Sequence, residues 1–191
     1  MRFAPVRIAV AGAHSTGKST FLSNVETRLR DSGLKVGRVA DLAQAARDSG
    51  FPILRDHVYE STLWIMAQGM RLEMEASKDT DVVLVDRPVP DALGYLLAAL
   101  DVTNRQEGRL PELYAIARAH SGYYDWIAYT VLDENVELGA DRDTDATFRR
   151  KAGERIAGLL DELIPNAKRI LFGENEAMLE DAVQFAVSRN G

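Results

Sequence analysis

The chain has 191 residues, of which 46% are hydrophobic, so it is long enough to bury one substantial core. Its formal net charge of −6 argues against a general nucleic-acid-binding protein, and the absence of cysteine excludes disulfides, thiolate zinc sites and cysteine nucleophiles. No apolar run approaches the roughly 18 residues of a membrane span, so we expect a single domain over residues 1–191 that is cytoplasmic and has no membrane partner.

The first predicted element is a strand, Val6–Ala11, and the segment after it carries the clearest motif of the chain. Gly12–Ser19 match the pattern G-x-x-x-x-G-K-[ST] between a strand and a helix, which is the setting of a P-loop. The glycines let backbone N–H groups approach phosphate oxygens, the lysine is placed for the β- and γ-phosphates, and the serine hydroxyl is placed for Mg²⁺. We therefore expect a bound purine nucleoside triphosphate, ATP or alternatively GTP, with Mg²⁺. The residues expected to contact it are Gly12, His14, Ser15, Thr16, Gly17, Lys18, Ser19 and Thr20.

Within that loop His14 occupies a variable position, so we interpret it as a loop residue and not as a base. The helix predicted next, Lys18–Ser32, is expected to end at Gly33 as a left-handed cap. A weaker strand, Lys35–Ala40, follows and delivers Asp41 to the edge of the sheet where ligands gather in open parallel sheets. Asp41 is then either an acceptor-binding group or general base, or the N-cap of the following helix.

A long helix is predicted over Arg55–Ser77, because its apolar residues recur at helical spacing. Three of them are methionines, Met66, Met70 and Met74. Such a stripe can line a groove for a cofactor or partner, but core packing is the better interpretation, since methionine fills irregular gaps in cores.

The strand Val82–Val85 is apolar throughout, as expected of a central strand buried on both faces. Asp86 follows at its carboxyl end, where it can hold the hydration shell of Mg²⁺ or accept the proton of an attacking hydroxyl. Arg87 can clamp a phosphate or an acceptor group bidentately. The alternatives are a helix-capping Asp86 and an Arg87 that pairs with it at the surface. Asp91 is interpreted as an intrahelical or capping group.

Two further strands are predicted, Trp126–Val131 and the weaker Arg169–Phe172. A helix with one apolar stripe, from Phe148 to Leu163, lies between them. Strands that alternate with helices in this way indicate crossover units and a parallel sheet covered on both faces.

The charge-dense segment before that helix, approximately residues 134–147, is predicted to be a small mobile lid. Helical periodicity turns Arg149 toward the apolar stripe and Arg150 toward water, where it can pair with Glu154. We therefore expect Arg142 and Arg149 to be the arginines that neutralise charge on a migrating phosphoryl group. A surface position is the alternative for each.

Three segments together resemble a known family: GAHSTGKST at Gly12–Thr20, DRPVPDALGYL at Asp86–Leu96, and the lid sequence Asp141–Asp143. The chain is similar to AAA-type P-loop ATP-binding proteins related to the ribosylnicotinamide kinase domain of NadR, within the nucleoside and nucleotide kinase superfamily. The resemblance implies a three-layer α/β/α fold with a five-stranded parallel sheet in the order 2-3-1-4-5. It also implies an ATP site at the loop and an acceptor site between the second strand, Asp86–Arg87 and the lid.

The function that we predict is transfer of the γ-phosphoryl group of ATP to a small nucleoside- or nucleotide-like acceptor. Lys18, Asp86, Asp41, Arg87, Arg142 and Arg149 are the predicted catalytic residues, with Ser19 and Asp86 at the metal. The alternatives are a regulatory protein that binds and slowly hydrolyses ATP or GTP, and a kinase that modifies an antibiotic or toxin. The expected partner is the small-molecule acceptor, and the prediction leaves room for a homodimer.

Overall fold

Five parallel strands form one sheet in the computed structural model, which describes residues 4–132, 145–171 and 175–191. Their order is β2-β3-β1-β4-β5, and Val10 lies opposite Asp86 in the central pair. This confirms the predicted α/β fold and the predicted strand order. The strands are β1 (Val6–Ala11), β2 (Val36–Val39), β3 (Val82–Asp86), β4 (Trp126–Thr130) and β5 (Lys168–Ile170).

The central strands are apolar on both faces because helices cover both sides of the sheet. All five residues of β3 are buried, and Ile8 and Leu84 face one helical layer while Ala9 and Val85 face the other. The helices are α1 (Lys18–Asp31), α2 (Ala43–Asp48), the short 3₁₀ helix η1 (Leu54–Asp56), α3 (Tyr59–Ala76), α4 (Val89–Thr103), α5 (Leu110–Ser121), α6 (Ala146–Leu163) and α7 (Asn175–Asn190).

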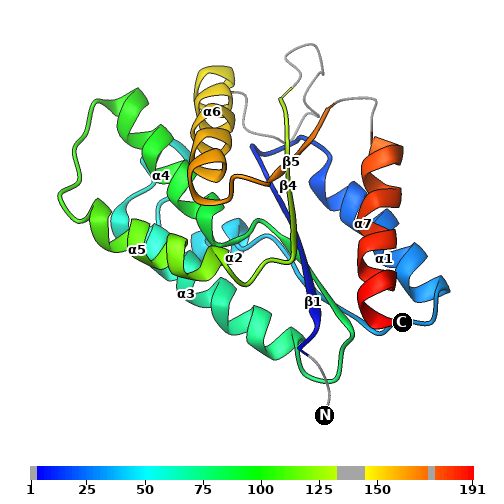
Figure 1. The fold of residues 1–191 in the computed structure, drawn as a ribbon. Coiled ribbons are helices and arrows are strands. Elements are labelled where there is room, and N and C mark those ends of the chain that lie inside the picture. The colour runs from blue at the N-terminus through cyan, green and yellow to red at the C-terminus, as the bar shows by residue number, and fades with distance from the viewer. Residues whose placement is uncertain (1–3, 133–144, 172–174) are drawn as a thin grey trace.

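The helices are distributed unequally over the two faces (Figure 1). Helices α1 and α7 pack together on one face, while α3, α4 and α6 cover the other, with α5 outside them. Helix α4 is therefore enclosed on nearly all sides and most of its residues are buried. Its Gly94 lies against α6 so closely that a Cβ atom there would come within 2.4 Å of Ile156 Cγ1.

One predicted helix differs from the structure. The helix expected over Arg55–Ser77 begins only at Tyr59, because η1 and an extended linker precede it. The methionine stripe is also only partly buried, since Met66 is fully buried whereas Met74 is 63% exposed, so the prediction of a core position for Met74 was wrong. The inward position on that turn is taken by Glu73, whose carboxylate accepts hydrogen bonds from the Tyr124 hydroxyl and contacts His120.

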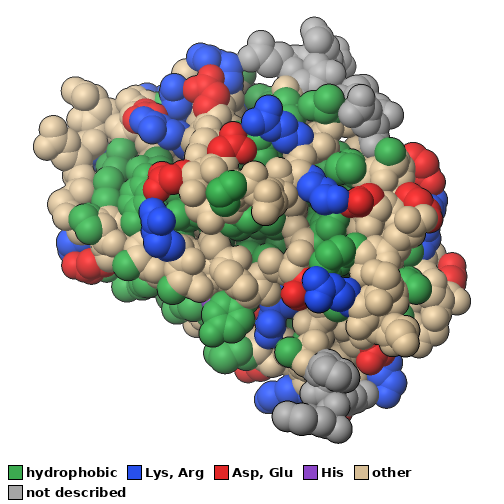
Figure 2. All heavy atoms as spheres, in the orientation of Figure 1, with side chains coloured by type: hydrophobic (Ala, Val, Ile, Leu, Met, Phe, Trp, Pro, Cys, Tyr) green, Lys and Arg blue, Asp and Glu red, His purple; other side chains and the backbone are tan. Residues whose placement is uncertain are grey.

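The surface carries charges of both signs. On the face shown in Figure 2, lysine and arginine side chains alternate with acidic ones and form no continuous basic stripe. None of the helices in the described part of the chain is both long and apolar enough to cross a membrane.

Candidate active site

The phosphate-binding segment connects β1 to α1 across the carboxyl ends of the central strands. Gly12 and Gly17 both have positive φ angles, +132° and +82°, in the region that favours glycine. At Gly12 the requirement is also steric, because a Cβ atom would lie 2.2 Å from the Thr130 hydroxyl at the end of β4. That hydroxyl in turn lies 2.5 Å from the Thr16 hydroxyl, so the end of β4 is hydrogen-bonded to the loop.

Lys18 is held inside the loop. Its ammonium group donates to the Ala13 carbonyl at 2.5 Å, and only 4% of the residue is exposed. Burial, with the positive charge of Arg87, lowers the pKa of Lys18 from its usual 10.5 to about 7. A negatively charged ligand in the loop would offset this desolvation, so the lysine is poised to gain from phosphate binding.

Ser19 and Asp86 meet at the end of β3. The serine hydroxyl donates to one carboxylate oxygen of Asp86 at 2.5 Å, and the other carboxylate oxygen is buried without a partner among the described residues. A hydroxyl beside an unsatisfied carboxylate oxygen fits a Mg²⁺ ion, which is bound in phosphate sites by one or two such groups together with water and phosphate oxygens. Within the described ranges, no group of three or more His, Asp or Glu residues forms an all-protein metal cage.

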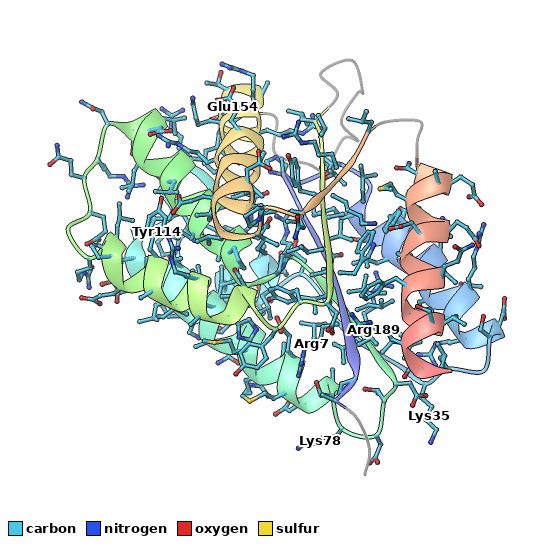
Figure 3. The ribbon with its side chains drawn as sticks, viewed as in Figure 1. Arg7, Lys35, Lys78, Tyr114, Glu154 and Arg189 are labelled. Carbon is cyan, nitrogen blue, oxygen red and sulfur yellow. The ribbon has the colours of Figure 1, made fainter. Side chains whose placement is uncertain are left out.

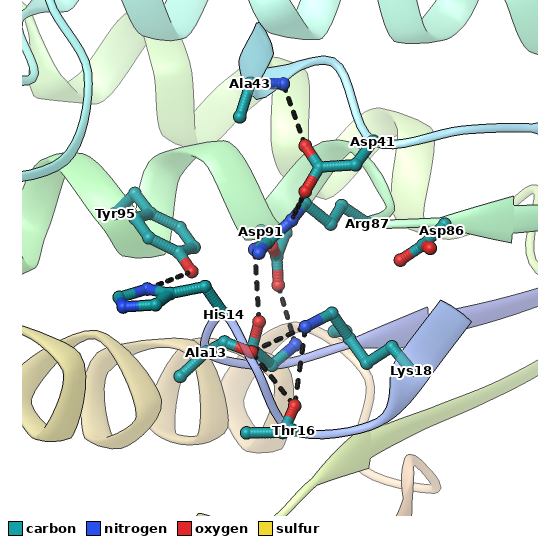
Figure 4. A network of polar contacts seen from close by, with 12 residues as sticks. Ala13, His14, Thr16, Lys18, Asp41, Ala43, Asp86, Arg87, Asp91 and Tyr95 are labelled. Atoms are coloured by element: carbon teal, nitrogen blue, oxygen red, sulfur yellow. Dashed lines mark hydrogen bonds and ion pairs between the residues drawn. The ribbon is translucent and has the colours of Figure 1, made fainter. Parts of the chain in front are cut away.

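Arg87 lies between two carboxylates (Figure 4). Its guanidinium donates to Asp41 at 2.5 Å and to Asp91 at 2.8 Å, and also to the Gly12 carbonyl at 3.2 Å. The Arg87 backbone has a φ of +70°, which is unusual for a non-glycine residue and directs its side chain back over the loop. Arg87 is therefore a buried organiser of the site and not the surface partner of Asp86 that was weighed as an alternative.

Asp41 combines the two roles that its sequence context left open. One carboxylate oxygen accepts the Ala43 N–H at 2.8 Å, as in a helix-capping interaction, while the other accepts from Arg87. Burial would raise its pKa, but the Arg87 guanidinium and the Ala43 amide together hold the pKa of Asp41 below its usual value. The carboxylate is thus an anion that lines the site and a weak base.

Asp91 is a site residue that the sequence interpretation assigned to an intrahelical or capping role. It is 1% exposed and accepts the Gly12 N–H at 2.9 Å as well as the Arg87 guanidinium. Burial raises its pKa, and the neighbouring Arg87 offsets only part of that effect. The i,i+4 spacing of Arg87 and Asp91 was the available signal. Its partner at Gly12, 79 residues earlier, could not be read from spacing.

The predicted inward orientation of Arg149 is confirmed. Arg149 is 6% exposed, and its guanidinium donates to the backbone carbonyls of His14 and Ser15 at 3.2 and 3.1 Å. Arg150 instead pairs with Glu154, which points away from the sheet on the outer side of α6 (Figure 3). Arg142 and nearly all of the predicted lid lie outside the described residues, and residues 145–147 stand at the start of α6.

His14, the remaining loop side chain of interest, packs beside Tyr95 of α4, with its Nδ1 atom 3.4 Å from the phenol oxygen. This contact is consistent with the interpretation of His14 as a loop residue. In Figure 4 its imidazole lies next to Tyr95 and away from Asp86 and Lys18. Thr20 is exposed at the start of α1 and lines the same cavity as the rest of the loop.

A single cavity of about 390 Å³ joins these groups. One part is lined by the loop from His14 to Thr20, and a second part continues past Asp41, Asp86 and Arg87 to a wall formed by η1, α3 and α4. That wall is mainly apolar, and the described residues that form it include Leu54, His57, Ile65, Val89, Ala92 and Tyr95.

Several solved structures share this fold. Thymidylate kinase from Candida albicans is 17% identical with a TM-score of 0.66, over 98% of this chain and 93% of that one. Deoxyadenosine kinase from M. mycoides, solved with dATP, is 11% identical with a TM-score of 0.60, over 96% and 98%. NadR, solved with NR, is 13% identical with a TM-score of 0.67 over 94% of this chain, which spans only 51% of the NadR chain.

The sheet order and the glycine-rich loop after β1 define a P-loop α/β fold, and these solved structures share that fold. Residues 7–170 match the model of a family described as AAA domain, and the chain belongs to that family. No curated protein matches the sequence at a significant level.

Proposed function

We propose that the protein is a Mg²⁺-dependent kinase that transfers the γ-phosphoryl group of ATP to a small nucleoside- or nucleotide-like acceptor. The observation that carries the proposal is the extent of the cavity. It continues from the loop past Asp41 and Arg87 to the apolar wall of η1, α3 and α4. A protein that only binds or hydrolyses a triphosphate has no need of this second compartment, whereas a kinase must hold an acceptor beside the phosphates.

The donor end of the site is the loop. On nucleotide binding Lys18 exchanges the Ala13 carbonyl for phosphate oxygens, which restores the charge that burial disfavours. Ser19 and Asp86 would hold Mg²⁺, which would supply positive charge that neutralises the phosphate groups. The choice of ATP is supported by NadR, which has been solved with NAD and AMP-PNP.

The acceptor end begins at Asp41 and Arg87. Asp41 orients the acceptor hydroxyl, and Arg87, fixed by Asp91, keeps a positive charge next to the transferred group. The metaphosphate-like character of phosphoryl transfer makes positioning more important than a strong base, which suits the lowered pKa of Asp41. Arg149, which donates to the His14 and Ser15 carbonyls of the loop, would turn to the phosphates when nucleotide binds, and Arg142 completes the proposed set of arginines.

The test is a phosphorylation screen with purified protein, ATP and Mg²⁺ against nucleosides, nucleotides and nicotinamide riboside. A phosphorylated product that depends on Lys18 and Asp86, as judged by Lys18→Ala and Asp86→Asn, supports the proposal. Tight ATP binding without transfer to any member of the panel would refute the kinase proposal and would favour the regulatory NTPase. Resistance of cells to an antibiotic, with no transfer to nucleosides, would favour the antibiotic-modifying kinase.

A further inference from the structure

His57 is a buried side chain without a polar partner. It is 2% exposed, and neither ring nitrogen makes a hydrogen bond within the described part of the chain. A buried polar atom that is left unpaired destabilises a protein, so native structures keep few of them, and those that persist often mark sites that acquire a partner from a ligand. The phosphate chemistry proposed above makes no use of this residue.

The backbone around His57 is held by hydrogen bonds, although its ring nitrogens are not. The residue ends η1, and its N–H donates to the Leu54 carbonyl at 3.1 Å. The Arg105 guanidinium donates to the carbonyls of Arg55 and His57 at 3.2 and 2.9 Å and so attaches this segment to the end of α4. The imidazole is thereby held on a rigid support, as a recognition group must be.

The ring lines the acceptor part of the cavity. It belongs to the wall of η1, α3 and α4 together with Leu54 and Ile65, and its centroid lies 6.5 Å from that of Tyr95. The carboxylates among the described lining residues are Asp41, Asp86 and Asp91, and none of them hydrogen-bonds to the His57 ring. This wall therefore combines an apolar surface with one unsatisfied imidazole.

The electrostatic setting specifies the kind of group that fits. Burial, together with the charge of Arg105, lowers the pKa of His57 to about 4, so the ring is neutral and offers one donor and one acceptor. Burial also raises the pKa of Tyr95 to about 12, so its phenol is neutral. A cationic ligand ring beside this neutral imidazole would be repelled by the nearby charge of Arg105.

We propose that His57 is the specificity-determining residue of the acceptor site and hydrogen-bonds an uncharged polar group, an amide or carbonyl of a neutral heterocyclic ring, in the acceptor. The inference rests on the proposed function and deepens it, because it selects neutral nucleoside-like acceptors over those with a cationic ring. A site built to hydrogen-bond a substrate group discriminates strongly against ligands that lack it.

The test compares the wild type with His57→Phe, which keeps a ring and removes both nitrogens, and with His57→Asn, which keeps a donor and an acceptor. The probes are adenosine, inosine, cytidine and thymidine as neutral acceptors and nicotinamide riboside as the cationic one. We expect the wild type to prefer a neutral acceptor. His57→Phe should raise the KM for it by about tenfold, the effect of one hydrogen bond, while the KM for ATP stays unchanged and His57→Asn recovers part of the loss.

Thermal unfolding distinguishes recognition from a merely structural role. Since the removed nitrogens have no hydrogen-bond partner among the described residues, His57→Phe should not lower the melting temperature. A lowered melting temperature with an unchanged acceptor KM would overturn the inference and leave the kinase intact, as would a wild-type preference for nicotinamide riboside. If ATP binds but no acceptor is phosphorylated, the proposed function fails. The inference about His57 then stands only if calorimetry shows that neutral nucleosides bind more weakly to His57→Phe than to the wild type.

Discussion

The two carboxylates that flank Arg87 test whether the burial of an ion pair determines how much its loss destabilises the protein. Asp91 and Asp41 hold the same guanidinium, but their side chains differ in exposure, 1% for Asp91 and 37% for Asp41. Loss of one partner of a buried pair costs about 3–5 kcal/mol, because the remaining charge stays buried. An exposed pair contributes about 1 kcal/mol or less. Asp91→Ala should therefore lower the free energy of unfolding by about 3 kcal/mol, and Asp41→Ala by about 1 kcal/mol at most.

The expected cost of Asp91→Ala lies at the lower end of that range because Arg87 keeps Asp41 and the Gly12 carbonyl as partners. Asp91→Asn separates the contributions further, since an amide oxygen can still accept the Gly12 N–H while the ion pair is lost. The assay is urea denaturation followed by tryptophan fluorescence, with m-values compared to verify that the same transition is measured. If Asp41→Ala destabilises the protein as much as Asp91→Ala does, the argument from burial is refuted.

Three other predictions follow from the same structure. Because Lys18 has a pKa of about 7 in the free protein and must be charged beside a triphosphate, nucleotide binding takes up a proton above pH 7. The Kd for ATP should then rise by up to about tenfold per pH unit, and a Kd that is flat from pH 6 to 9 would contradict this. Gly94→Ala should lower the free energy of unfolding by about 1–3 kcal/mol, because the new methyl group overpacks against Ile156. Gly158→Ala, on the exposed surface of α6, should raise it by about 0.5–1 kcal/mol. Chemical denaturation of both variants measures the difference. Chelation by EDTA should abolish turnover in the wild type, and Asp86→Asn should raise the Mg²⁺ concentration needed for half-maximal rate; an unchanged Mg²⁺ requirement would remove Asp86 from the metal site.

Much of the site could be predicted because local patterns encode it. The loop pattern, the apolar β3 strand and the helical phase of Arg149 each depend on residues close in sequence, and the structure places them as expected. The strand order came from the family resemblance and was confirmed. Where the pattern is short-range and periodic, sequence reasoning is sufficient.

The missed residues depend on tertiary contacts. Asp91 owes its role to the Gly12 amide, which reaches it only when β1 and β3 pair in register. His57 was assigned to a helix, but the chain there forms η1 and an extended linker whose position is set by Arg105, which follows α4. Met74 was taken as a core residue because periodicity cannot foresee that Glu73 turns inward to Tyr124. Tertiary packing overrides local propensity at each of these positions.

The central claim, that this cavity carries out phosphoryl transfer to a small acceptor, is tested most directly by the stoichiometry of product formation. ADP and phosphorylated acceptor would be counted in the same reaction by ³¹P NMR, with ATP, Mg²⁺ and the acceptor from the screen that gives the highest rate. The account predicts one phosphorylated acceptor for each ADP and little inorganic phosphate. ADP accompanied by an equal amount of inorganic phosphate, whatever acceptor is present, would contradict it and identify a hydrolase.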